Sequence, residues 1–145
     1  MFVDFKVFLN AIRIVINSKL FIQNRMNSKK NETIATKWFE AFNEHNLEKL
    51  LSLYHTDAKH FSPKLKIRKL ETKGFVIGKK ALREWWQDSF NRLPTLRYTP
   101  TSLTANNSAV FMEYLRQVDG EADLLVAEIL EIENNLIIAS RVYHG

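Results

Sequence analysis

His60 and Ser62 are the first residues in the chain whose types and spacing suggest chemistry. They lie two residues apart in a segment predicted to be a short strand, 59–62, so their side chains point to the same face. An imidazole has an ordinary pKa of about 6.5, which suits proton transfer at neutral pH. A serine hydroxyl needs an activating partner before it can act as a base. His60 is therefore a candidate general base; the alternative is a structural histidine in the core or at a pocket rim.

Glu128 is the candidate acid. It lies in the apolar run 124–130, where burial disfavours the ionised form of a carboxyl group and raises its pKa. Such a glutamic acid can donate a proton or a hydrogen bond at neutral pH. A histidine base that faces it across a cavity could move protons on a carbonyl compound. The alternative is an ion pair between Glu128 and Arg116 or Arg141.

Other kinds of site find little support in the sequence. The chain contains no cysteine, which excludes disulfides, thiolate metal ligands and cysteine nucleophiles. His55, Asp57 and His60 are metal-ligand types, but their spacing matches no strong motif. The four glycines form no phosphate-binding loop. We therefore predict neither a metal nor a cofactor.

The net charge of +5 is confined to the start of the chain. Residues 1–30 contain six basic residues and one acidic residue, whereas residues 31–145 contain 15 of each. A neutral body makes general binding to nucleic-acid backbones a poor hypothesis. We therefore expect no nucleic-acid partner.

The first 25 residues have the pattern of a basic amphipathic helix. The apolar positions at helical spacing are Phe5, Phe8, Leu9, Ile12, Ile16 and Leu20. Three interpretations stay open: a membrane-surface or partner-binding helix, an organellar transit peptide, or an extension outside the functional domain. The polar stretch 26–31 looks like an ordinary protein start and favours the last. We therefore predict that 1–30 is a dispensable or mis-assigned extension, with no membrane partner, and that 31–145 is the functional domain.

The apolar periodicity then indicates which elements position the candidate residues. Three segments have the spacing of helices: 32–43, 47–54 and 79–91. Asn-Asn and Asp-Gly pairs, which favour hairpin turns, divide the second half of the chain. Four strands are expected there: 95–105, 108–118, 122–133 and 136–143. Long strands in one meander twist and curl, so the prediction is an α+β domain in which three helices cover the concave side of a curved antiparallel sheet.

The basic segment 64–68 alternates with period two. This pattern favours an edge strand that lysine and arginine protect from aggregation. The alternative is a basic lid over the cavity mouth that attracts anionic ligands.

Several of these stretches together resemble the nuclear transport factor 2-like superfamily, in its SnoaL-like branch, which is ketosteroid isomerase-like and polyketide cyclase-like. They are 38–43, 46–47, 54–58, 62–63, 78–86 and 141–145, and the resemblance extends from Thr33 to the end. It implies a cone-shaped, cystatin-like α+β barrel, usually a homodimer formed through the outer face of the sheet. It does not imply one function, because this superfold hosts enzymes of several kinds and non-catalytic binders.

The resemblance also assigns roles to positions, with departures. Trp38 stands where ketosteroid isomerases place a tyrosine that donates to the substrate oxyanion. Ser62, before Pro63, stands where they place the catalytic aspartate, so the family's base is missing. Glu128 matches their second carboxylic acid, which is held protonated. The face that carries His60 is the pocket face in these enzymes, so His60 could replace the missing base.

We therefore predict a small cytoplasmic protein that binds a hydrophobic small molecule in an internal pocket. His60 and Glu128 are the candidate catalytic residues for an isomerase- or cyclase-type proton transfer. The candidate binding residues are Trp38, Phe42, Tyr54, Ser62, Trp85 and Trp86. The alternative is a non-catalytic binding, interaction or dimerisation module of the same fold, in which the tryptophans are only core.

Overall fold

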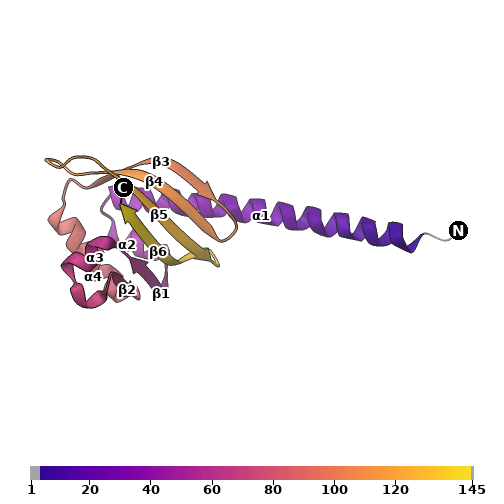
Figure 1. The fold of residues 1–145 in the computed structure, drawn as a ribbon, viewed down its shortest axis with the longest axis horizontal. Helices are drawn as coiled ribbons and strands as arrows, with labels where there is room; N and C mark the ends of the chain where they lie inside the picture. Colours follow the sequence, from indigo (N-terminus) through magenta and orange to yellow (C-terminus); the bar gives the residue numbers. More distant parts are fainter. Residues whose placement is uncertain (1–3, 145) are drawn as a thin grey trace.

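The structure, a computed structural model, describes residues 4–144. The helices are α1 (Phe5–Asn43), α2 (Leu47–Ser52), α3 (Pro63–Arg68) and α4 (Lys79–Arg92), with a 3-10 turn at Leu70–Thr72. The strands are β1 (Tyr54–Phe61), β2 (Phe75–Ile77), β3 (Arg97–Ala105), β4 (Ala109–Gln117), β5 (Leu124–Glu133) and β6 (Leu136–His144). Figure 1 shows these elements in one body from which the first part of α1 projects.

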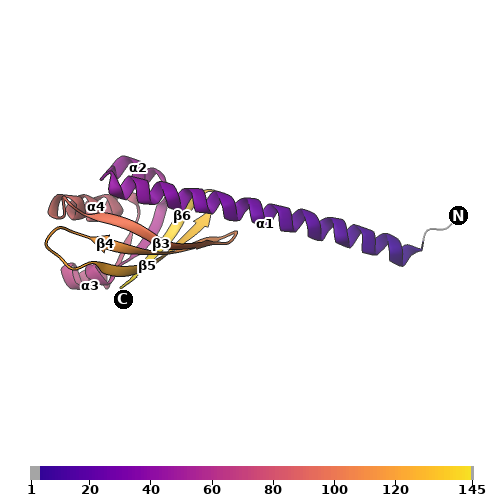
Figure 2. The ribbon, with the colours of Figure 1, turned by 90° about the horizontal axis from the view of Figure 1, so that it is seen from above.

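The strands form one curved, unclosed six-stranded sheet in the order β2-β1-β6-β5-β4-β3. Strands β3 to β6 make the expected antiparallel meander, and β1 pairs antiparallel with β2 and parallel with β6. Helix α1 packs on β3 and β4, while α2 and α4 pack on β1; Figure 2 shows α1 running along one side of the sheet. The predicted α+β class is therefore confirmed.

The turns of the meander have the local chemistry that the sequence indicated. Asn134 and Asn135 both adopt positive φ, 50° and 63°, as a tight turn between twisted strands requires. Gly120, at φ 81°, turns the chain between β4 and β5. At the remaining turn, the side chain of Asn106 accepts hydrogen bonds from the backbone N–H groups of Ser108 and Ala109.

The prediction of an edge strand at 64–68 is wrong, because this segment is helix α3. Ser62 is its N-cap and accepts a hydrogen bond from the backbone N–H of Lys64 at 3.3 Å. Pro63 stands at the first helical position, which proline favours. These two start signals outweigh an alternation of five residues, and they place the basic side chains of the segment on a helix.

Helix α1 is longer than the predicted helix 32–43 and continues without a break back to Phe5. Residues 4–26 are exposed throughout, and Ser28 makes a bond to the body, from its hydroxyl to the Ala105 carbonyl at 2.9 Å. Asn31 is buried and donates to the Asn106 carbonyl at 2.9 Å. Across residues 4–144, no helix combines the length and the apolar character needed to cross a membrane.

A chain that begins at Met26 is expected to unfold with the same melting temperature and the same cooperativity as the full chain. The side chains of residues 4–23 make no hydrogen bond to the rest of the described body, and Asn24 makes a long one, 3.4 Å, to exposed Asn107. Exposed segments of this kind contribute little to global stability. Differential scanning calorimetry checks this, and a loss of cooperative unfolding would show that the extension belongs to the core.

Candidate functional site

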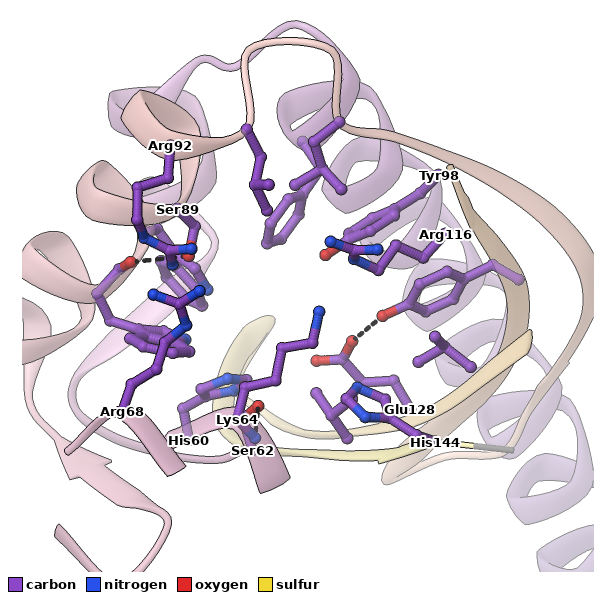
Figure 3. A pocket seen from close by; sticks show the side chains of 18 of the residues that line it. His60, Ser62, Lys64, Arg68, Ser89, Arg92, Tyr98, Arg116, Glu128 and His144 are labelled. Carbon is purple, nitrogen blue, oxygen red and sulfur yellow. Dashed lines mark hydrogen bonds between the residues drawn. The ribbon is translucent and has the colours of Figure 1, made fainter. Parts of the chain in front are cut away.

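A cavity of about 330 Å³ lies between the helices and the concave face of the sheet (Figure 3). Seven of the eight predicted site residues line it: Trp38, Phe42, His60, Ser62, Trp85, Trp86 and Glu128. They come from helices α1 and α4, strands β1 and β5, and the N-cap of α3. The fold therefore brings together side chains that are up to 90 positions apart in the sequence.

Tyr54 does not line the cavity. It is the first residue of β1 rather than the end of a helix, and it is fully buried. Its hydroxyl accepts a hydrogen bond from Trp38 Nε1 at 2.9 Å and donates to Ser140 Oγ at 3.5 Å. Tyr54 therefore supports the wall of the cavity from behind instead of contacting a ligand.

His60 is held at the cavity wall by a buried polar contact. Its Nδ1 lies 2.7 Å from Ser140 Oγ, and Trp86 packs against its ring with 5.6 Å between centroids. Burial lowers the pKa of His60 to about 4, so the imidazole is neutral at pH 7. If Nδ1 carries the proton, it donates to Ser140 and leaves the Nε2 lone pair free; if it does not, Ser140 donates to Nδ1.

Glu128 is buried and forms no ion pair among residues 4–144. Tyr114 donates its hydroxyl proton to Oε2 at 2.8 Å, whereas Oε1 is buried without any hydrogen-bond partner in the described part of the chain. Burial raises the pKa of Glu128 to about 8, although the bond from Tyr114 lowers it in part. The carboxyl group is therefore mostly protonated at neutral pH.

The predicted alternative for Glu128, an ion pair with a nearby arginine, is not what the structure shows. Arg116 pairs with Glu121 at 2.6 Å, and Arg141 pairs with Glu131 at 2.7 Å. Glu128 therefore pairs with neither arginine. Its carboxyl group points into the cavity (Figure 3). An uncharged glutamic acid in this place can give a hydrogen bond to an oxygen atom of a ligand.

Aromatic rings make up much of the remaining wall. Tyr98 stacks on Trp38 with 5.7 Å between centroids, and Tyr114 lies 4.5 Å from Tyr98. Burial is the main cause that raises the pKa of both tyrosines, and the nearby Glu128 carboxyl raises it further. Both tyrosines are therefore neutral donors. Sequence reasoning missed them, although inward alternation along 95–105 and 108–118 is the signal that could have found them.

Sequence reasoning also missed several of the basic side chains at the cavity. Besides the predicted residues, the lining includes Lys64, Arg68, Arg92, Arg116 and His144. Only Lys64 and Arg68 belong to the segment that the sequence offered as a basic lid. The others come from α4, β4 and β6, and no local pattern indicates that these elements meet.

Comparison with known proteins identifies the family and the fold. The family model of the SnoaL-like domain matches residues 35–140. A SnoaL-like protein of unknown function from Burkholderia thailandensis has a TM-score of 0.73 at 19% identity, covering 81% of this chain and 95% of that one. An NTF2-like protein from Anabaena variabilis has a TM-score of 0.67 at 18% identity, covering 82% and 90%.

A third structure, from Catenulispora acidiphila, has a ketosteroid isomerase-like fold and is in complex with trimethylamine. Its TM-score is 0.62 at 18% identity, covering 77% of this chain and 85% of that one. A search of curated proteins gives no significant match. At these identities the solved structures show the shared fold, and the family model, which spans well over half of the chain, shows that the chain belongs to the SnoaL-like family.

Proposed function

We propose that the chain binds a hydrophobic small molecule in this cavity and moves a proton on it, with His60 as base and Glu128 as acid. The observation that carries the proposal is Oε1 of Glu128, a buried polar atom without a partner in residues 4–144, in the wall that also holds His60. Leaving a buried polar atom unpaired costs about 1–3 kcal/mol. A carbonyl oxygen of a ligand would remove that cost.

The protonation states fit this division of roles. At neutral pH His60 is neutral and can accept a proton, and Glu128 is protonated and can donate. His60 would take the proton from the carbon next to a carbonyl, while the electron pair moves to the carbonyl oxygen and Glu128 stabilises the charge there. Because burial disfavours the imidazolium, the proton is then returned to another atom of the ligand, which completes an isomerisation. In a cyclase-type step the enolate carbon would instead attack a second carbonyl carbon of the ligand, and the imidazolium would give its proton to the alkoxide that forms.

This role requires one tautomer of His60. Nδ1 must carry the proton and donate it to Ser140 Oγ, so that Nε2 is free to act as the base. We expect ¹⁵N NMR at pH 7 to show a protonated Nδ1 and an unprotonated Nε2. The opposite tautomer would make His60 a donor to the cavity and would contradict its role as base.

The catalytic step can be tested with enolisable aryl ketones and β-diketones small enough for the cavity. In D₂O the wild type should exchange the proton next to the carbonyl, as followed by ¹H NMR. Glu128→Gln keeps the shape and a donor but not the acid, and His60→Phe removes the base. Each should slow exchange by about 10²–10⁴-fold, and Glu128→Gln should retain binding while Glu128→Leu weakens it.

Equal exchange rates in the wild type and in both variants would contradict these roles. Binding without exchange in the wild type would instead support the second candidate function, a non-catalytic binding module. The continuous aromatic wall from Trp38 to Tyr114 favours that candidate, because it gives an apolar ligand a surface without requiring chemistry. The trimethylamine complex of the Catenulispora relative supports small-molecule binding by this fold under both candidates.

We further propose a homodimer formed through the outer face of the sheet. On that face Phe111, Leu125 and Tyr143 expose 45%, 45% and 46% of their surface, and they lie on the adjacent strands β4, β5 and β6. A two-fold symmetric partner would cover them with the same patch. Light scattering at high micromolar concentration should therefore give twice the chain mass of 17.0 kDa, and Leu125→Lys should give the monomer; a wild-type monomer would contradict the proposal.

A cytoplasmic location stays a prediction.

A further inference from the structure

Four basic side chains from three separate elements converge on the cavity. They are Lys64, Arg68, Arg92 and Arg116. Lys64 and Arg68 lie one turn apart on α3, Arg92 ends α4, and Arg116 lies on β4. Figure 3 shows the ammonium group of Lys64 and the guanidinium group of Arg116 pointing into the open space, with Arg68 and Arg92 at the opposite wall. We name these four residues the cationic wall.

The carboxylates of the protein neutralise only part of the cationic wall. Arg116 pairs with Glu121 at 2.6 Å, and Arg92 pairs with Asp88 at 2.8 Å. Within residues 4–144, neither Lys64 nor Arg68 has an ion-pair partner. Glu128 offers no countercharge at neutral pH, because burial keeps it protonated.

The repulsion within the cationic wall is visible at Lys64. Burial lowers the pKa of Lys64, and the charges of Arg116, Arg68 and Arg92 lower it further, against the opposing effect of Glu121. Arg116 is itself buried, with 7% of its surface exposed. Gathering like charges at a partly buried place costs free energy, and an anion bound among them would recover it.

We propose that the ligand of this cavity is a carboxylate, whose apolar ring system lies on the aromatic wall and whose carboxylate binds Lys64 in the space between Arg68 and Arg116, which face that space from opposite walls. The inference rests on the proposed function and adds the chemical class of the ligand. Arginine guanidinium groups match the planar carboxylate with paired donors, and lysine adds a mobile point charge. The ring system then lies against the aromatic wall, within the cavity that also holds His60 and Glu128.

The test compares 2-naphthoate with 2-naphthamide, which has nearly the same shape and no charge. Isothermal titration calorimetry on the full chain should show that the carboxylate binds about tenfold more tightly. The preference should shrink when NaCl is raised from about 50 mM to about 300 mM, because salt screens partly exposed charges. Lys64→Gln and Arg68→Gln should each weaken naphthoate binding several-fold and leave naphthamide binding unchanged.

Lys66→Gln is the matched control. Lys66 lies on the same short helix and has the same charge, but its ammonium group lies 5.3 Å from the ring centre of Phe61 and it does not line the cavity. Equal losses of naphthoate affinity in the Lys64 and Lys66 variants would overturn the proposal, because they would show only a general charge effect. Circular dichroism spectra that match the wild type would establish that each variant is folded.

The outcomes separate this inference from the proposed function. Equal binding of the two naphthyl compounds would overturn the carboxylate while leaving a hydrophobic pocket in place. Preference for naphthoate together with an absence of proton exchange on any ketone would support the carboxylate and count against the catalytic step. Failure of both compounds to bind would overturn the pocket itself, and the carboxylate inference with it.

Discussion

Glu128→Gln is expected to remove a loss of stability that we expect in the wild type as pH rises from 6.5 to 8. The folded state holds the proton of Glu128 up to a pKa of about 8, whereas an ordinary glutamic acid loses it near 4.5. Between these values the folded state binds the extra proton, so its stability falls as pH rises, by about 1.4 kcal/mol per pH unit. Over the whole interval this amounts to about 5 kcal/mol, a large share of the stability of a typical domain.

His60 has the opposite effect on the acid side. Its pKa falls from 6.5 in the ordinary state to about 4 in the folded state, so the unfolded state binds the extra proton between these values. Stability from His60 is present above pH 6.5 and is lost as pH falls toward 4, by about 3 kcal/mol in total. In the wild type the two effects cancel between pH 4.5 and 6.5, and only the Glu128 effect, about 2 kcal/mol, remains from 6.5 to 8.

Urea denaturation of four proteins, the wild type and three variants, across pH 4–8 checks this directly. Glu128→Gln should gain stability up to pH 6.5 and then stay level, and His60→Phe should lose stability steadily from pH 4.5 upward. Glu133→Gln is the matched control, because it removes an exposed carboxyl group from the same strand. Parallel profiles for the wild type and Glu128→Gln would contradict a buried proton on Glu128.

Trp38→Ala is expected to destabilise the fold by about 3–5 kcal/mol, as loss of a buried tryptophan does. Trp38 exposes 1% of its surface and touches the rings of Phe39, Phe42 and Tyr98. It also anchors Tyr54 through its indole N–H. Although Trp38 lines the cavity, its contacts are mainly those of a core residue, and urea denaturation at constant pH measures their contribution.

Trp38→Phe separates packing from the hydrogen bond. It keeps an aromatic ring but removes the indole donor to Tyr54, so it should cost about 1–2 kcal/mol. A cost below about 1 kcal/mol for Trp38→Ala would show that the ring serves the ligand rather than the fold.

The meander could be predicted from the sequence because its turns are encoded locally. The Asn134-Asn135 pair separates two apolar runs. A tight turn at this pair, where both residues adopt positive φ, lets the two runs pair as antiparallel strands. Tyr54 was misplaced because its spacing from Leu47 and Leu50 fits a helix, yet α2 ends at Ser52 and pairing with β6 makes Tyr54 a strand residue. Tertiary contacts decided that boundary, and a single sequence does not display them.

The candidate site, too, could be predicted from the sequence only in part. Glu128 could be found because a carboxyl group is unusual in an apolar strand, and His60 because the family resemblance assigned the pocket face to its strand. Arg116 could not be recognised as a cavity residue, since the sequence offered it only as a partner for Glu128. Its true partner, Glu121, lies five residues further along the chain, just after Gly120, and a turn signal alone does not say which side chains meet across the turn.

The parallel pairing of β1 with β6 has a consequence for how the protein is made. His60 lies on β1, and its partner Ser140 on β6 is 80 residues later in the sequence, so β1 cannot complete its pairing while a ribosome is still adding the intervening residues. Pairings between distant segments form slowly, and strand edges that wait for them are open to aggregation. The cavity therefore assembles late in synthesis, and a nascent chain that stops at β5 already carries Glu128 but has no strand to join it to His60.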